Sequence, residues 1–198
     1  MYKYYFKRVI DFVTSLILII LMIPCLILIS FAIFIDDPGE IFFSQKRIGI
    51  NKSTFNLYKF RSMKMTTPHD TPTHLLKNPD MYITKIGKFL RSTSLDELPQ
   101  LLNILLGQMS FIGPRPALWN QDDLIRERDK YGANDIRPGL TGWAQVNGRD
   151  ELQIEEKARL DGEYVSKMSL MFDLKCILLT FKVVFTKEGL KEGGTGGK

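Results

Sequence analysis

Residues that bind transition metals or form disulfides are scarce in this chain. Its 198 residues include two cysteines and two histidines. Cys25 and Cys176 each lie in an apolar run, where buried free thiols are expected, and no cysteine–histidine spacing typical of zinc is present. His69 and His74 lie in a polar, proline-containing stretch that is typical of a loop. These shortages argue against both a disulfide framework and a zinc site.

Acidic residues are also in the minority. The chain has 22 Asp and Glu against 27 Lys and Arg, which gives a net charge of +5 and a pI near 9.1. A basic chain favours an anionic partner, whether nucleic acid, a lipid headgroup or a phosphorylated substrate. With 44% hydrophobic and 25% charged residues the chain can build a core, and its length indicates one domain with an appendage.

Charged residues are absent from residues 12–35, a run about long enough to cross a bilayer. Lys3, Lys7 and Arg8 precede it, and such a positive flank is typical of an end that stays in the cytoplasm. The run is long for a signal peptide, and no small-residue cleavage site follows it. We therefore expect this segment to insert into a membrane.

Pro24 lies near the middle of that run, where it removes a helical hydrogen bond and favours a kink. Two arrangements fit this pattern. In the first, the helix enters the membrane, bends at Ile23-Pro24 and leaves on the same face, which keeps the lysine- and arginine-rich remainder in the cytoplasm. In the second, it is an ordinary kinked transmembrane helix, since neighbouring groups can satisfy the freed carbonyls. The residues alone leave both open.

The remaining pattern predicts an α+β fold that is mostly helical. Short strands are expected at residues 41–45 and 54–58, joined in a hairpin, and a long loop at 65–80. Apolar spacing predicts helices over residues 84–90, 95–105, 118–131, 151–168 and 170–185. The chain is thus expected to comprise a re-entrant membrane hairpin (1–36), a folded domain (37–188) and a flexible glycine-rich tail (189–198).

The densest candidate site is residues 91–116, where Asp96 and Glu97 stand at the start of an apolar helix. Ser94 and Glu97 fit a capping box, in which both side chains bond to backbone amides at the helix start. Pro99 conflicts with a regular cap, because it removes a backbone hydrogen bond. Either the helix starts later or its first turn is distorted, and both would leave the acidic pair more accessible than ordinary capping groups.

Several cations could serve an anion near this pair. Arg115 stands between Pro114 and Pro116, which lower the entropy lost when its guanidinium binds an anion; a plain proline-rich turn is the alternative. Lys59 and Arg61 alternate along the second predicted strand and so share one face. That face is either a solvated strand edge or a phosphate cradle.

Residues 137–149 form a second dense stretch, with three glycines that would let the backbone approach a ligand closely. Gln145, Asn147 and Arg149 alternate, as they would on one face of a strand. Trp143 could stack on a base or anchor at a membrane interface. Any turn-rich hairpin would show the same glycine spacing, so this stretch alone is weak evidence.

Six stretches carry a resemblance to a known family. They are K-R-V-I-D-F (7–12), the Pro24-interrupted apolar run, Y-K-F-R-S-M (58–63), R-S-T-S-L-D-E-L-P-Q-L-L-N (91–103), M-S-F-I-G-P-R-P (109–116) and R-P-G-L-T-G-W-A-Q-V-N-G-R (137–149). In this colinear order they resemble the small monotopic bacterial phosphoglycosyl transferases, also called bacterial sugar transferases. The series covers most of the chain and is specific, whereas one G-P-R-P would mean little.

The resemblance implies transfer of a sugar-1-phosphate from a UDP-sugar to undecaprenyl phosphate, with release of UMP. In such enzymes the aspartate of the acidic pair, here Asp96, attacks the β-phosphorus and Mg²⁺ assists. The reaction would be the first membrane step of a surface glycan (capsule, O-antigen or glycoprotein), at the cytoplasmic face of the bacterial inner membrane. The family's re-entrant helix bends at a Ser-Pro pair, whereas this chain has Ile23-Pro24 and lacks that hydroxyl.

With the resemblance, the candidate residues take roles. Asp96 and Glu97 are the expected catalytic residues and Mg²⁺ ligands. The candidate substrate-binding residues are Lys59, Arg61, Arg91, Arg115, Gln145, Asn147, Arg149 and Asp161. Asp173 is the alternative to Asp161, and each could instead cap a helix or pair with a lysine.

The expected partners are the UDP-sugar, undecaprenyl phosphate, the phospholipid membrane and other glycan-assembly enzymes, with no nucleic acid. Two other functions fit less well. One is a non-enzymatic basic module that binds anionic membrane surfaces, and the other is a membrane-bound Mg²⁺-dependent phosphatase.

Overall fold

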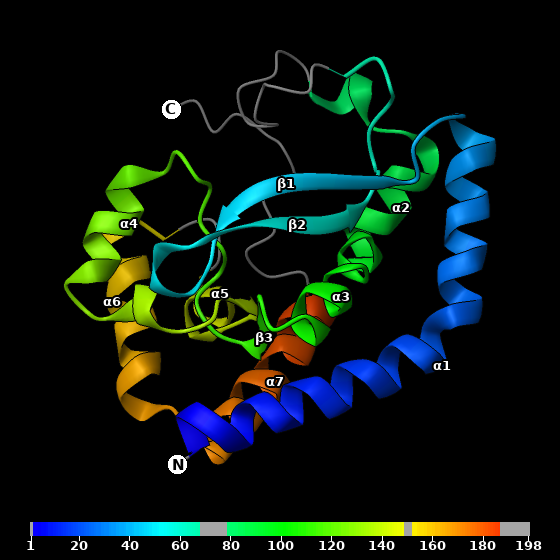
Figure 1. Ribbon diagram of the computed structural model, residues 1–198. Coiled ribbons are helices and arrows are strands. Elements are labelled where there is room, and N and C mark those ends of the chain that lie inside the picture. The colour runs from blue at the N-terminus through cyan, green and yellow to red at the C-terminus, as the bar shows by residue number, and fades with distance from the viewer. Residues whose placement is uncertain (1, 68–78, 149–151, 187–198) are drawn as a thin grey trace.

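The computed structural model describes residues 2–67, 79–148 and 152–186, and helices predominate in it (Figure 1). The N-terminal part comprises a π-helical turn (Tyr2–Phe6) and the long helix α1 (Lys7–Asp36). The later helices are α2 (Lys85–Thr93), α3 (Gln100–Leu105), α4 (Asp122–Asp129), α5 (Trp143–Val146), α6 (Ile154–Lys167) and α7 (Leu170–Thr186). The strands are β1 (Phe42–Ile48), β2 (Thr54–Phe60), β3 (Ser110–Ile112) and β4 (Gly139–Thr141). Short 3-10 turns cover Ile50–Lys52, Pro79–Tyr82, Leu95–Glu97 and Ala133–Asp135.

Helix α1 is continuous but changes direction in its middle, and Pro24 lies inside it. Figure 1 shows the rest of the chain seated within this bend, with α3 and α7 beside the first arm and α2 beside the second. A proline in a helix interior is the usual cause of such a bend. The helix is long and apolar enough to cross a membrane, with a mean hydropathy of 3.2.

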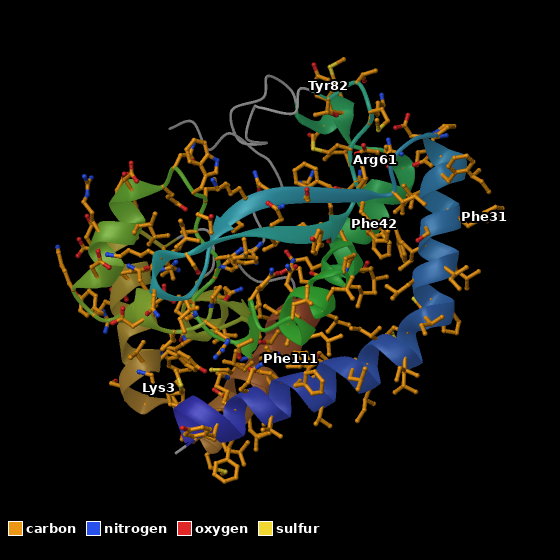
Figure 2. All side chains as sticks on the ribbon, in the orientation of Figure 1. Lys3, Phe31, Phe42, Arg61, Tyr82 and Phe111 are labelled. Atoms are coloured by element: carbon orange, nitrogen blue, oxygen red, sulfur yellow. The ribbon has the colours of Figure 1, made fainter. Side chains whose placement is uncertain are left out.

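The two sides of α1 differ in an unusual way. Lys7, Asp11 and Ser15 recur at every fourth residue and are buried against the domain, because residues four apart share one helix face. Large apolar side chains cover the opposite side, and Figure 2 shows Phe31 projecting away from the domain. The helix thus turns its polar face to the protein and its apolar face outward, as a helix surrounded by lipid does.

The first arm of α1 is fixed to the domain by its basic end. Lys7 Nζ lies 2.6 Å from Asp173 Oδ2, and both side chains are almost fully buried. The Arg8 guanidinium donates to the carbonyls of Ile104 (2.6 Å) and Leu105 (2.7 Å) at the end of α3. Because the last carbonyls of a helix have no partner within it, Arg8 acts as a cap supplied by a distant helix.

The second arm is fixed at its acidic end. Asp36 Oδ2 accepts from the amide of Ile86 at the start of α2 (2.8 Å), where a carboxylate also suits the helix dipole. Asp37 forms an ion pair with Arg61 (2.5 Å) and accepts from the Met65 amide (2.9 Å). Both ends of α1 are therefore bonded to the same folded body.

The predicted hairpin is confirmed, with strands longer than expected. β1 and β2 pair antiparallel from Phe42 opposite Phe60 to Ile48 opposite Thr54. A second, parallel pair joins β3 to β4, with Ser110 opposite Gly139. This pairing brings the two motif stretches 109–116 and 137–149 side by side. The strand expected around residue 145 is wrong, because Trp143–Val146 forms a short helix.

The predicted helices of the domain are confirmed, with shifted ends. Thr84 caps α2, since its Oγ1 accepts from the Gly87 amide at 2.9 Å. α4 begins four residues later than predicted because Leu118 forms an antiparallel bridge with Arg47 of β1. Most of the predicted loop (residues 68–78) and the tail (189–198) lie outside the described residues.

Candidate active site

The acidic pair lies on a 3-10 turn (Leu95–Glu97) between α2 and α3. The capping box predicted for Ser94 and Glu97 is wrong: Ser94 ends α2 with a left-handed backbone (φ 57°), and its side chain caps no amide. α3 begins only at Gln100, as the late-start alternative predicted, because Pro99 has no amide hydrogen to donate. The side chains of Asp96 and Glu97 therefore do not cap a helix.

Leu98, next to the acidic pair, joins two hydrophobic clusters. It packs against the cluster that Leu18 and Ile19 of the first arm of α1 also join, and against the cluster that contains Ile29 and Ile33 of the second arm. Burial of Leu98 helps to fix the turn, because dispersion contacts add up over many atoms. The acidic turn is thus packed onto two clusters to which the two arms of α1 contribute.

Buried Asn103 ties α3 to β2. Its side chain accepts from the Tyr58 amide (3.0 Å) and donates to the Asn56 carbonyl (2.8 Å). Asn103 is fully buried, where an unpaired amide would be costly. The result is a fixed distance between the acidic turn and Lys59, the next residue of β2.

Glu97 is the shared partner of two cations. Its Oε1 lies 2.6 Å from Lys59 Nζ and 3.1 Å from Arg115 Nη2. Burial alone would raise the pKa of the Glu97 carboxyl, but Lys59 and Arg115 outweigh it and hold that pKa well below its usual range. Glu97 is thus an ionised carboxylate that sets the positions of both cations.

Asp96 differs from its neighbour. It is 8% exposed, and its Oδ2 lies 3.8 Å from Lys59 Nζ. Within the described parts of the chain, no hydrogen bond is made to its carboxylate. Burial raises the pKa of Asp96, with Lys59 and then Arg91 opposing the rise and Glu97 adding to it. A buried carboxylate that is not held by hydrogen bonds is suited to reaction rather than to structure.

Four cations surround the two carboxylates. Lys59 and Arg115 contact Glu97, Arg91 attracts Asp96, and Arg47 of β1 acts on Glu97. Burial, together with the neighbouring Arg115, lowers the pKa of Arg47 to about 10. Among these described side chains positive charge exceeds negative charge, which favours an anionic ligand.

Arg47 was not among the predicted site residues. The sequence held one signal. Side chains alternate between the two faces of a strand, so Phe43, Gln45 and Arg47 share one face of β1. Nothing in the residues alone indicated that this face meets the segment of Arg115.

Comparison with known proteins identifies the chain. A family model described as "Bacterial sugar transferase" matches residues 2–187. The chain belongs to the bacterial sugar transferase family.

The relatives of this sugar transferase include three named proteins. An "Uncharacterized sugar transferase EpsL" of Bacillus subtilis is 39% identical over 187 residues, covering 94% of this chain and 90% of the relative. A UDP-glucose:undecaprenyl-phosphate glucose-1-phosphate transferase of Escherichia coli is 38% identical, and the match covers 88% of this chain and 39% of the relative. An undecaprenyl-phosphate glucose phosphotransferase of Komagataeibacter xylinus is 39% identical, and the match covers 89% of this chain and 35% of the relative. The chain thus matches well under half of the two glucose-specific relatives.

Two predicted substrate-binding residues of the sugar transferase are placed elsewhere. Arg61 is 8% exposed and pairs with Asp37 at the end of α1, so it serves the anchoring of that helix (Figure 2). Asp161 is 1% exposed, and its Oδ2 lies 2.7 Å from Arg128 Nη2. Each side chain is engaged in an ion pair with a residue distant in the sequence, partly buried for Arg61 and fully buried for Asp161, and so is not presented to the acidic pair.

The residues of the second dense stretch also have other contacts. Gln145 Nε2 donates to the Leu140 carbonyl (3.0 Å), and Asn147 Nδ2 to the Trp143 carbonyl (2.7 Å). They brace α5 rather than share a strand face. Arg149 lies outside the described residues.

The glycines of this stretch serve a backbone crossing. A Cβ on Gly142 would lie 2.0 Å from the Gly113 carbonyl oxygen, which no structure tolerates. The close approach predicted to a ligand is, at this glycine, an approach of one motif's backbone to the other's.

The described residues offer few side chains that could hold a metal. No group of three His, Cys, Asp or Glu side chains that could hold a metal occurs in the described ranges. Asp96 and Glu97 remain as adjacent carboxylates. Mg²⁺ commonly binds one or two carboxylates together with substrate phosphates and water, and this pair fits that mode rather than a site built of protein ligands alone.

Proposed function

We propose that this protein transfers a sugar-1-phosphate from a UDP-sugar to undecaprenyl phosphate, releasing UMP, through a phosphosugar intermediate on Asp96. The observation that carries the proposal is the buried Asp96 carboxylate, free of hydrogen bonds from the described residues, beside a Glu97 that holds two cations. Family membership and relatives named for undecaprenyl-phosphate transferase activities support the reaction class.

In the first step, an Asp96 carboxylate oxygen attacks the β-phosphorus of the UDP-sugar. A bond forms between that oxygen and phosphorus, and the bond from phosphorus to the bridging oxygen breaks, so UMP leaves with the bridging oxygen. Lys59 and Arg115, set by Glu97, neutralise charge on the diphosphate, which is the main requirement of phosphoryl transfer. Arg91 and Arg47 add to the positive field.

In the second step, a phosphate oxygen of undecaprenyl phosphate attacks the same phosphorus, and Asp96 leaves as a free carboxylate. The product is undecaprenyl-diphosphate-sugar. Leu98 joins two hydrophobic clusters to which the arms of α1 also contribute, and this shared packing supports delivery of a lipid substrate from the membrane.

Mg²⁺ is the proposed cofactor, held by Asp96 and Glu97 together with the diphosphate. When bound, it would supply Lewis-acid stabilisation of phosphate charge.

We further propose that α1 is a re-entrant hairpin in the cytoplasmic leaflet of the bacterial inner membrane. Both of its ends bond to one folded body, through Lys7 and Arg8 at the start and Asp36 and Asp37 at the end. A straight span would separate these ends by the thickness of the bilayer. Helix α7 adds a further apolar surface, with Leu170, Met171, Leu174, Leu178 and Phe181 exposed.

The function is tested with purified protein, Mg²⁺, undecaprenyl phosphate and a panel of UDP-sugars. One UDP-sugar is expected to give UMP and an equal amount of lipid-linked sugar diphosphate. Free sugar-1-phosphate in place of the lipid product would indicate a phosphatase instead. Binding of anionic vesicles without UMP from any UDP-sugar would favour the non-enzymatic module.

The topology is tested by labelling single cysteines with a membrane-impermeant maleimide. In a background without Cys25 and Cys176, cysteines replace Tyr5 and Glu40, which are exposed near the two ends of α1. Both are expected to be protected in intact spheroplasts and labelled after lysis, as a cysteine at exposed Lys130 should be. Labelling of one end only in intact spheroplasts would establish a transmembrane helix.

A further inference from the structure

The carbonyl groups of the segment that carries Arg115 are bound by several distant parts of the described chain. Two of its residues are prolines, which have no amide hydrogen to donate. Four successive carbonyls accept from other parts of the chain. The pairs are Gly139 N to Pro114 O (2.8 Å), Arg128 Nη1 to Arg115 O (3.0 Å), Arg47 Nη1 to Pro116 O (3.1 Å) and Ile48 N to Ala117 O (3.0 Å).

The two central carbonyls, of Arg115 and Pro116, are bound by guanidinium groups. Backbone amides are the usual hydrogen-bond donors to the carbonyls of a loop. The use of two arginine side chains on adjacent carbonyls is energetically costly by comparison. Charged donors give stronger and more directional hydrogen bonds than amides do. They also come from two different elements, Arg47 from β1 and Arg128 from α4.

Asp161 fixes the second of these arginines. Arg128 Nε and Nη2 lie 2.8 and 2.7 Å from Asp161 Oδ2, and the two side chains are 4% and 2% exposed. A buried pair of this kind contributes little to net stability compared with apolar residues of the same size. Its retention therefore calls for another role, and the bond from Arg128 to the Arg115 carbonyl supplies one.

We infer that Asp161, Arg128 and Arg47 are positioning residues that clamp the backbone around Arg115, so that its guanidinium is presented to the donor diphosphate. Arg115 itself is 45% exposed and reaches Glu97. An exposed arginine side chain loses conformational entropy when it binds a ligand. A fixed backbone reduces that loss, because the guanidinium then has fewer accessible positions before binding. The inference rests on the proposed function.

The test replaces the buried pair by apolar residues, Arg128→Met with Asp161→Leu. This double variant removes the bond to Arg115 while avoiding an unpaired buried charge, so it is expected to fold. We expect the KM for the UDP-sugar in UMP release to rise about tenfold, the effect of one charge-assisted hydrogen bond, with kcat changed less than about twofold. Arg47→Lys, which keeps the charge but alters the fork geometry, should raise KM in the same direction.

A double-mutant cycle separates positioning from general damage. In an Arg115→Met background the Arg128→Met/Asp161→Leu change should raise KM no further, since the group that it positions is gone. Additive effects in the cycle, or an unchanged KM in the folded double variant, would overturn the inference. If the wild-type protein releases no UMP from any UDP-sugar, the proposed function fails instead.

A matched control comes from the same helix. Glu156 and Arg159 of α6 form a pair (2.6 Å) whose side chains are 45% and 53% exposed. Glu156→Gln with Arg159→Gln should leave KM and kcat unchanged. A rise in KM for this control equal to that of the buried pair would also overturn the inference.

Discussion

An Asp96→Asn variant is expected to fold normally and to release no UMP from a UDP-sugar, with or without lipid acceptor. The amide keeps the shape of the carboxyl group but cannot attack phosphorus as an anion. We expect UMP release to drop by more than about 10³-fold, the scale on which the loss of a nucleophile acts. Chromatography of UMP from a labelled UDP-sugar measures the loss.

The stability of this variant gives a second, independent readout. The folded-state pKa of Asp96 is raised above its unfolded value, chiefly by burial, so the carboxyl stabilises the fold only at low pH, and its ionised form opposes folding at neutral pH. Asp96→Asn should therefore leave the Tm unchanged or raise it. Activity should fall on acidification at a pH above the value of about 4 for an ordinary aspartate.

Glu97→Gln is the matched contrast. The pKa of Glu97 is lowered in the folded state because Lys59 and Arg115 outweigh burial, so its charge stabilises the fold above its unfolded pKa, and this is lost as the pH falls. Removal of the charge takes away the carboxylate that contacts both Lys59 and Arg115, at a cost of about 2 kcal/mol. The Tm should drop by several degrees. Normal UMP release by Asp96→Asn, or equal Tm changes in both variants, would contradict the assigned roles.

An Asp173→Ala variant is expected to lose the attachment of the first arm of α1. Asp173 accepts from the hydroxyls of Tyr2 (2.5 Å) and Tyr164 (2.7 Å) and pairs with Lys7 (2.6 Å). The change removes the carboxylate that pairs with the buried Lys7 ammonium, which costs about 3–5 kcal/mol. A cost of this size corresponds to a fall in Tm of about 10 °C for a chain of this length.

Thermal unfolding in detergent micelles measures this effect, and limited proteolysis before residue 12 reports whether the arm has detached. Lys130→Ala breaks an exposed pair with Glu127 and serves as the control, for which no change is expected. An unchanged Tm in Asp173→Ala would show that apolar packing alone holds the arm.

Local patterns were enough for much of the fold. The hairpin and the long helices were predicted because alternation and helical spacing are properties of neighbouring residues. The irregular start of α3 was predicted for the same reason, since Pro99 acts on its own turn. Helix α5 was not, because its four residues are too few to show a period and depend on Gln145 and Asn147 for support.

Long-range ion pairs were the main source of error at the site. Arg61 and Asp37 are separated by 24 residues, and Arg128 and Asp161 by 33. Arg61 and Asp161 looked available to bind a substrate, because nothing in the sequence around either residue indicates an ion-pair partner. The acidic pair stood out in the sequence as part of a dense motif, but which of its carboxylates is held by cations followed only from the position of Lys59 on β2.

Helix α1 is anchored at both ends, and it also contributes Leu18, Ile19, Ile29 and Ile33 to the two hydrophobic clusters that Leu98 joins. The turn that carries Asp96 and Glu97 therefore rests on clusters to which both arms of the helix contribute. Removal of α1 would expose the apolar side chains of these clusters to water. A fragment that lacks α1 is therefore expected to be less stable than the whole chain and to hold the acidic turn less firmly.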